Sequence, residues 1–360
     1  MPQLQAKKAA APAAAPAKKA AAPATAPAKK QAPAQAAAAK KAAKPARDRS
    51  SLAEQTEFVK ALWYGDWGKG KTTALASLAH LGHMVHIDAE SGLKKRPLSN
   101  LGVPLDNIEP FRLSTEPGAA AERFENLNQL FWELKDELED PDAADPVIGI
   151  MWDSVTETQK LLLEDIVGKG VAKAERSGQD RDEFQIYRED WGVNTEQMRR
   201  LIRRFRDLPC HVGFSALPRR DVDDDGVVVY GPAVSPALQT DLLGYVDIVI
   251  HVDVVEYDGQ VFYVGDTSPA GKYIAKDRFG VLPRKMVDPT FPRIIDYVNG
   301  VIEAENDPLQ QEFLDARRSS SARAEAEKAQ GSTKKTHGRQ SVRQRADAEI
   351  KGEQEATDAD

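Results

Sequence analysis

The chain has 360 residues, of which 49 are Lys or Arg and 56 are Asp or Glu, so its formal net charge is -7. No apolar run reaches the roughly 18 residues of a membrane span, and the chain start lacks the apolar stretch of a secretory signal. A single cysteine, Cys210, excludes an internal disulfide and a multi-cysteine metal site. We therefore expect a cytoplasmic protein that has no membrane partner.

Charge divides the chain into three parts. Residues 1–47 carry +10, residues 48–300 carry -14 and residues 301–360 carry -3. The central part holds nearly all the aromatic and β-branched residues, which is enough for one α/β core. We predict a disordered basic arm over 1–47, a folded domain over 48–300 and a charged, mostly disordered tail over 301–360, with a short helix near 308–328.

The arm is rich in Ala, Lys and Pro, and its lysine pairs recur with an 11-residue period. Proline disfavours a continuous helix, and no large apolar residue follows Leu4, so the composition predicts an extended tether. Such a tether can bind phosphate backbones without reading sequence, or it can serve only as a solubilising linker.

The first chemical motif lies at the start of the central part. A predicted strand over residues 58–64 runs into the pattern G-x-x-x-x-G-K-T, and a helix is expected over 74–81. This context is that of a P-loop, whose backbone amides surround the phosphates of ATP. Lys71 would contact the β- and γ-phosphates, and Thr72 would ligand Mg²⁺. The predicted ATP-binding residues are Gly65, Asp66, Trp67, Gly68, Lys69, Gly70, Lys71, Thr72 and Thr73.

Carboxylates follow the next two predicted strands. The strand over 83–87 leads to Glu90, and the strand over 147–152 ends at Asp153. An acid at the carboxyl end of a buried strand is typical of the Walker B position, which holds Mg²⁺. Glu90 lies where a carboxylate could orient or deprotonate the attacking water.

The order of these parts resembles the ATPase core of RecA recombinases, over roughly residues 55–300. Within that family the chain is most similar to short, core-only proteins encoded by bacteriophages, including the single-strand annealing type. The resemblance implies a RecA-like α/β P-loop NTPase core with a mainly parallel central sheet flanked by helices. It assigns the phosphate Lys, the Mg²⁺ hydroxyl, the catalytic Glu and the Walker B Asp to Lys71, Thr72, Glu90 and Asp153. The segments that carry it are the P-loop, residues 236–247 and Lys276-Asp277-Arg278-Phe279-Gly280.

The resemblance also implies a homo-oligomer, either a ring or a filament, that contacts single-stranded DNA. The resemblance implies that Ser215, on the strand over 211–216, is a polar sensor near the γ-phosphate. The following hairpin, with its turn at Asp225-Gly226, and the region after Asp153 would face DNA. The candidate DNA-binding residues are Arg219, Arg220, Lys169 and Lys173. Acidic neighbours favour the alternative that these charges only solvate the surface.

Lys276 and Arg278 are similar to the basic finger that DnaB-type hexameric helicases insert into a neighbouring subunit. Such a cation stabilises the charge on the transferring phosphoryl group, so the active site would lie between subunits. We find no match to the large C-terminal DNA-gathering domain of RecA or to its glutamine-containing DNA loop, so the resemblance does not imply strand exchange.

We therefore expect a DNA-dependent ATPase that binds single-stranded DNA and promotes annealing or homologous recombination of phage DNA in the cytoplasm of a bacterial host. Single-strand-binding or replication proteins are candidate partners. Two alternatives stay open at this point: a helicase or helicase loader on the same core, and a scaffold that binds nucleotide without turnover.

Overall fold

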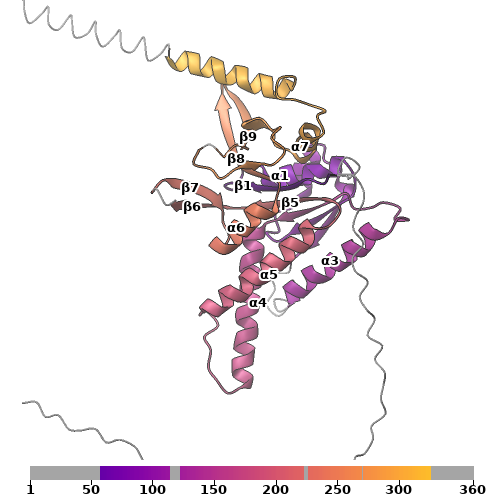
Figure 1. Ribbon diagram of the computed structural model, residues 1–360, viewed down its shortest axis with the longest axis vertical. Coiled ribbons are helices and arrows are strands. Elements are labelled where there is room, and N and C mark those ends of the chain that lie inside the picture. The colour runs from indigo at the N-terminus through magenta and orange to yellow at the C-terminus, as the bar shows by residue number, and fades with distance from the viewer. Residues whose placement is uncertain (1–56, 114–121, 223–225, 270, 326–360) are drawn as a thin grey trace, which may run out of the picture. The chain divides into compact units, whose positions relative to one another are not determined.

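A computed structural model describes residues 57–113, 122–222, 226–269 and 271–325. Six strands of its central sheet are parallel, in the order β3 (Ile108–Arg112), β2 (Met84–Asp88), β4 (Gly149–Asp153), β5 (His211–Ala216), β1 (Lys60–Tyr64) and β8 (Ile248–Tyr257). Three antiparallel strands complete it: β9 (Gln260–Asp266), β10 (Lys276–Asp277) and β11 (Lys285–Val287). The predicted α/β fold class, a core with a mainly parallel central sheet flanked by helices, is confirmed (Figure 1).

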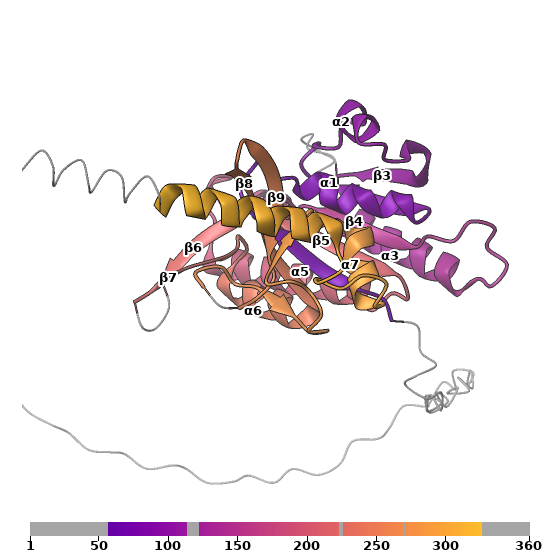
Figure 2. The same cartoon turned by 90° about the horizontal axis from the view of Figure 1, so that it is seen from above.

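Helices cover both faces of the sheet, which is why β2 and β4 are mostly apolar and are buried along their length. One face packs against α3 (Arg123–Glu139), α4 (Val155–Arg176), α5 (Arg188–Arg206) and α6 (Pro236–Tyr245). The other packs against α1 (Lys71–Ala76), α2 (Lys95–Asn100) and α7 (Phe291–Val298). Figure 2 shows α1 and α2 on one side of the sheet and α5 and α6 on the other.

The chain after Asp153 differs from the expectation. It was predicted to form a DNA-facing loop, but it folds into the long helices α4 and α5, joined by residues 177–187. Ser154 caps α4, because its side chain accepts a hydrogen bond from the backbone of Glu157. Lys169 and Lys173 therefore lie on a helix and not on a loop.

The hairpin predicted after the strand at 211–216 is present. Strands β6 (Pro218–Val222) and β7 (Val228–Pro232) pair antiparallel in a separate two-stranded sheet. Residues 223–225 at its turn lie outside the described part. Edge strand β3 and the short 3-10 helix η3 (Leu105–Asn107) were not predicted. The helix predicted over 74–81 is present, but from Ser77 to His80 it is the 3-10 helix η2.

Ordered structure continues beyond residue 300. Residues 308–325 are helical, and Phe313 is fully buried against Val264 and Val287 of the sheet. The described part of the helix expected near 308–328 thus packs on β9 and β11. The predicted arm over 1–47 and the acidic end of the tail lie outside the described residues. Within the described ranges, no helix is long and apolar enough to cross a membrane.

Candidate active site

The P-loop leaves the carboxyl end of β1 and leads directly into α1. Gly68 and Gly70 have φ angles of 74° and 84°, which side chains other than glycine rarely adopt. Gly65 is required for a different reason, since a Cβ atom there would lie 2.5 Å from the carbonyl oxygen of Val252. The glycines therefore let the loop turn tightly against β8 and present its amides at the start of α1.

Lys71 occupies the predicted phosphate position and is largely buried, with 8% of its surface exposed. Its ammonium donates hydrogen bonds to the carbonyl oxygens of Gly65 at 2.8 Å and Asp66 at 2.9 Å. Desolvation lowers the pKa of Lys71, and the nearby carboxylates of Asp153 and Glu90 oppose this shift. Exchanging the two carbonyls for phosphate oxygens would give the ammonium a charged partner, so the site favours an anion.

The two predicted magnesium ligands meet beside the P-loop. The Thr72 hydroxyl donates to Oδ2 of Asp153 at 2.6 Å, and Asp153 ends β4. The hydroxyl of Ser215, the predicted sensor, donates to the other carboxylate oxygen. Hydroxyl and carboxylate oxygens are donors that Mg²⁺ prefers, and it binds through one or two of them together with phosphate oxygens. Thr72 and Asp153 therefore fit the predicted role, and Ser215 orients Asp153 from β5.

Glu90 follows β2 by two residues and points to the same edge of the sheet. The hydroxyl of Ser154 donates a hydrogen bond to Oε1 of Glu90. Burial raises the pKa of Glu90, and the hydrogen bond from Ser154 lowers it in part. A carboxylate that is oriented in this way can accept a proton from a water molecule or align that water for attack.

These groups line one cavity of about 460 Å³, within the size range of small-molecule sites. Its polar lining comes from the P-loop, from the carboxylates of Glu90, Asp153 and Asp288, and from Thr290. Its apolar lining includes Leu101, Leu217, Val252, Tyr263, Val264 and Pro289. The cavity can thus bind a nucleoside triphosphate and place Glu90 near its phosphates.

The two residues of the predicted basic finger lie near the amino ends of the parallel strands, whereas the P-loop lies at their carboxyl ends. Lys276 pairs with Val249, near the beginning of β8, whereas the P-loop follows the end of β1. Within the described chain these residues therefore do not join the cavity. The finger hypothesis requires only that they reach the cavity of another subunit.

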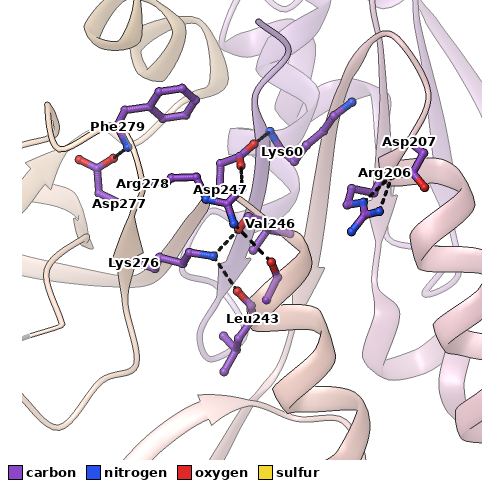
Figure 3. A network of polar contacts seen from close by, with 11 residues as sticks. Lys60, Arg206, Asp207, Leu243, Val246, Asp247, Lys276, Asp277, Arg278 and Phe279 are labelled. Atoms are coloured by element: carbon purple, nitrogen blue, oxygen red, sulfur yellow. Dashed lines mark hydrogen bonds and ion pairs between the residues drawn. The ribbon is translucent and has the colours of Figure 1, made fainter. Parts of the chain in front are cut away.

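Both finger residues contact the end of α6 in their own chain (Figure 3). Lys276 donates to the carbonyl oxygens of Leu243 at 2.9 Å and Val246 at 2.7 Å. Arg278 bonds Asp247 at 2.6 Å, but 55% of its side chain is exposed. Lys276 therefore caps a helix, and Arg278 is the residue of the two that a neighbour could engage.

The four candidate DNA-binding residues are not brought together as one cluster. Arg219 bonds Asp221 and the carbonyl oxygen of Val234, and Lys169 pairs with Glu125. Arg220 on β6 and Lys173 on α4 are exposed. Two of the four side chains are thus available to an incoming anion without breaking a contact.

Sequence reasoning missed three residues that shape the site: Ser154, Asp253 and Tyr263. A serine that follows a strand-terminal Asp and precedes a helix is a detectable cap signal, so the position of Ser154 was open to prediction. Tyr263, whose ring lies 3.1 Å from a Cβ built on Gly70, and Asp253 are far from the P-loop in sequence. No local pattern links them to it.

The chain is similar to a protein-family model and to a solved structure. Among solved structures, the flagellar accessory protein FlaH from Methanocaldococcus jannaschii matches with 11% identity and a TM-score of 0.32, covering 64% of this chain and 84% of that one. No curated protein matches in sequence. A family model described as an AAA domain matches residues 57–279, which is more than half of the chain and includes the P-loop, Glu90 and Asp153. The chain therefore belongs to this AAA domain family and contains a nucleotide-binding P-loop ATPase domain.

Proposed function

We propose that the protein is a magnesium-dependent, DNA-stimulated ATPase that binds single-stranded DNA and promotes annealing or homologous recombination of phage DNA. The observation that carries this proposal is the short path from the phosphate site to the hairpin. Asp153 accepts a hydrogen bond from Ser215 on β5, and β5 leads after one residue into β6 with Arg219 and Arg220. A change at the magnesium site can therefore reach the hairpin through a single strand.

The proposed DNA contact is electrostatic and is repeated over many subunits. Because the central part has a net charge of -14, one copy as a whole repels a phosphate backbone and can bind it only where basic groups are exposed locally. Arg220 on the hairpin is exposed and is the first candidate. Single-strand-binding proteins combine such charges with aromatic stacking, and Tyr187 and Trp191 at the start of α5 are partly exposed.

Assembly is the second element of the proposal. We infer that Arg278 of one subunit enters the nucleotide cavity of the next, in a ring or a filament, where it would stabilise charge during phosphoryl transfer. The cations that line the described cavity from its own chain are Lys69 and Lys71. A neighbour's arginine would thus add a third positive charge at the phosphates.

Binding of dye-labelled DNA tests the proposal directly. With ATP and Mg²⁺ present, we expect the full chain to bind single strands more tightly than duplex, and Arg220→Ala to weaken single-strand binding. Lys160→Ala, which removes an exposed lysine of α4 paired with Glu157, is the matched control and should not change it. Equal affinity of the Arg220 variant and the wild type would remove the hairpin from the proposal.

Strand annealing of complementary labelled oligonucleotides then separates the alternatives. We expect faster annealing with ATP than without it. Unwinding of a forked duplex would instead favour a helicase, and nucleotide binding with no phosphate release, with or without DNA, would favour a scaffold.

A further inference from the structure

The P-loop carries a second lysine whose side chain the motif does not explain. Lys69 lines the nucleotide cavity, and its ammonium lies 2.7 Å from Oδ1 of Asp253 on β8. Both side chains are partly exposed, at 29% and 36%. The hydrogen bond to Asp253 raises the pKa of Lys69. Burial alone would raise the pKa of Asp253, but the hydrogen bond from Lys69 outweighs burial, so the pKa of Asp253 is lowered. Both groups are therefore charged at neutral pH.

Other contacts hold the loop against the sheet without this ion pair. Gly65 packs on the carbonyl of Val252, and Gly70 packs on the ring of Tyr263, so neither position has room for a side chain. Partly exposed ion pairs contribute only about 0–1 kcal/mol to stability. The Lys69–Asp253 pair is thus not needed to fix the loop, and it is weak enough for a stronger anion to replace it.

A nucleoside triphosphate is such an anion, since several negative charges would lie in the same cavity as the Lys69 side chain. We propose that Lys69 is a second phosphate-binding cation, released from Asp253 when a triphosphate enters, and that Asp253 lowers the affinity by competing for it. The flexible stem of lysine allows the ammonium to move between the two partners while the backbone stays in place. The proposal rests on nucleotide binding at this cavity and not on the proposed action on DNA.

A double-mutant cycle in the full chain tests it, with Mg-ATP and Mg-ADP binding measured by calorimetry in the absence of DNA. We expect Lys69→Met to weaken ATP binding by about three- to tenfold, the range for one charge-assisted contact of modest exposure. We expect Asp253→Asn to strengthen it by about two- to fivefold, because the lysine is then no longer held. In the Lys69→Met background, Asp253→Asn should change nothing.

Opposite signs for the two single variants separate this role from a merely structural one. If the ion pair only braced the loop, both variants would weaken binding, and that result would overturn the proposal. Asp253→Asn strengthening ATP binding equally with and without Lys69 would also overturn it, because the aspartate would then act by direct repulsion. Lys160→Met, which breaks an exposed lysine–glutamate pair near the start of α4 and does not line the cavity, should leave ATP binding unchanged. Lys71→Ala tests whether ATP binds in this cavity at all. Unaltered ATP binding by that variant would mean that ATP binds elsewhere.

Discussion

Ser154 joins two parts of the active site, so removing its hydroxyl makes a sharp test of the role of Glu90. In Ser154→Ala, α4 loses the hydrogen bond between the serine side chain and Glu157, and Glu90 loses the donor at its Oε1 atom. Loss of a serine N-cap costs about 1 kcal/mol in unfolding free energy. For a domain of this size we expect a decrease in melting temperature of about 2–4 °C.

The effect on catalysis should be larger than the effect on folding. General base or water-orienting groups contribute about 10²–10⁴-fold to rate, so Glu90→Gln should lose that factor while it keeps ATP binding. Ser154→Ala leaves the carboxylate in place but unoriented, and we expect a decrease in kcat of about tenfold, a small part of that factor. Phosphate release and calorimetric ATP binding, measured on the same preparations, separate the two effects.

The pH profile gives Ser154→Ala a readout that misfolding cannot imitate. Burial holds the pKa of Glu90 above its ordinary value of 4.5, and the Ser154 hydrogen bond lowers it in part. Hydrolysis needs the ionised carboxylate, so kcat should fall as pH decreases through the folded pKa. Without the serine hydroxyl that pKa rises, and the acidic limb should shift to higher pH. An unchanged kcat together with an unchanged limb would refute the role assigned to the Ser154–Glu90 contact.

Three further predictions follow from other parts of the chain. Lys276→Met leaves two carbonyl oxygens at the end of α6 without their donor and should lower the unfolding free energy by about 1–2 kcal/mol, seen as a lower melting temperature. Arg278→Ala removes a half-exposed side chain and should leave the melting temperature nearly unchanged. If Arg278 acts in a neighbour's site, the variant should hydrolyse ATP more slowly by a factor on the order of 10³. Equal turnover would exclude that role. Deleting residues 1–47 should flatten the salt dependence of DNA affinity, because up to about ten phosphate contacts are lost, and an unchanged slope would mean that the arm is only a tether.

Much of the catalytic core could be predicted because its chemistry is local. The P-loop motif determines the positions of Lys71 and Thr72 at once, and an acid at the end of a buried strand predicts Asp153. Parallel strands end at one edge of a sheet, so these residues had to converge there with Ser215. The hydrogen bonds from Thr72 and Ser215 to Asp153 are the expected result of that topology.

Residues whose role depends on distant pairing could not be predicted in the same way. The K-x-R pattern at 276–278 indicates a chemistry but not a location, and only the antiparallel pairing of β10 with β8 places it at the edge opposite the P-loop. Asp253 and Tyr263 approach the P-loop because β8 lies beside β1 and pairs with β9. The helical path of α4 was missed because its second half contains Gly168 and Gly170 and buries only Val167, so burial no longer imposes an apolar period there.

The most direct test of the account is the rate of ATP hydrolysis by the full chain without DNA, with single-stranded DNA and with duplex DNA. Because β5 carries Ser215, which donates a hydrogen bond to Asp153, and leads into the hairpin, we predict strong stimulation by single strands and weak stimulation by duplex. The same rate in all three conditions would contradict the proposal that this AAA-family ATPase acts on single-stranded DNA.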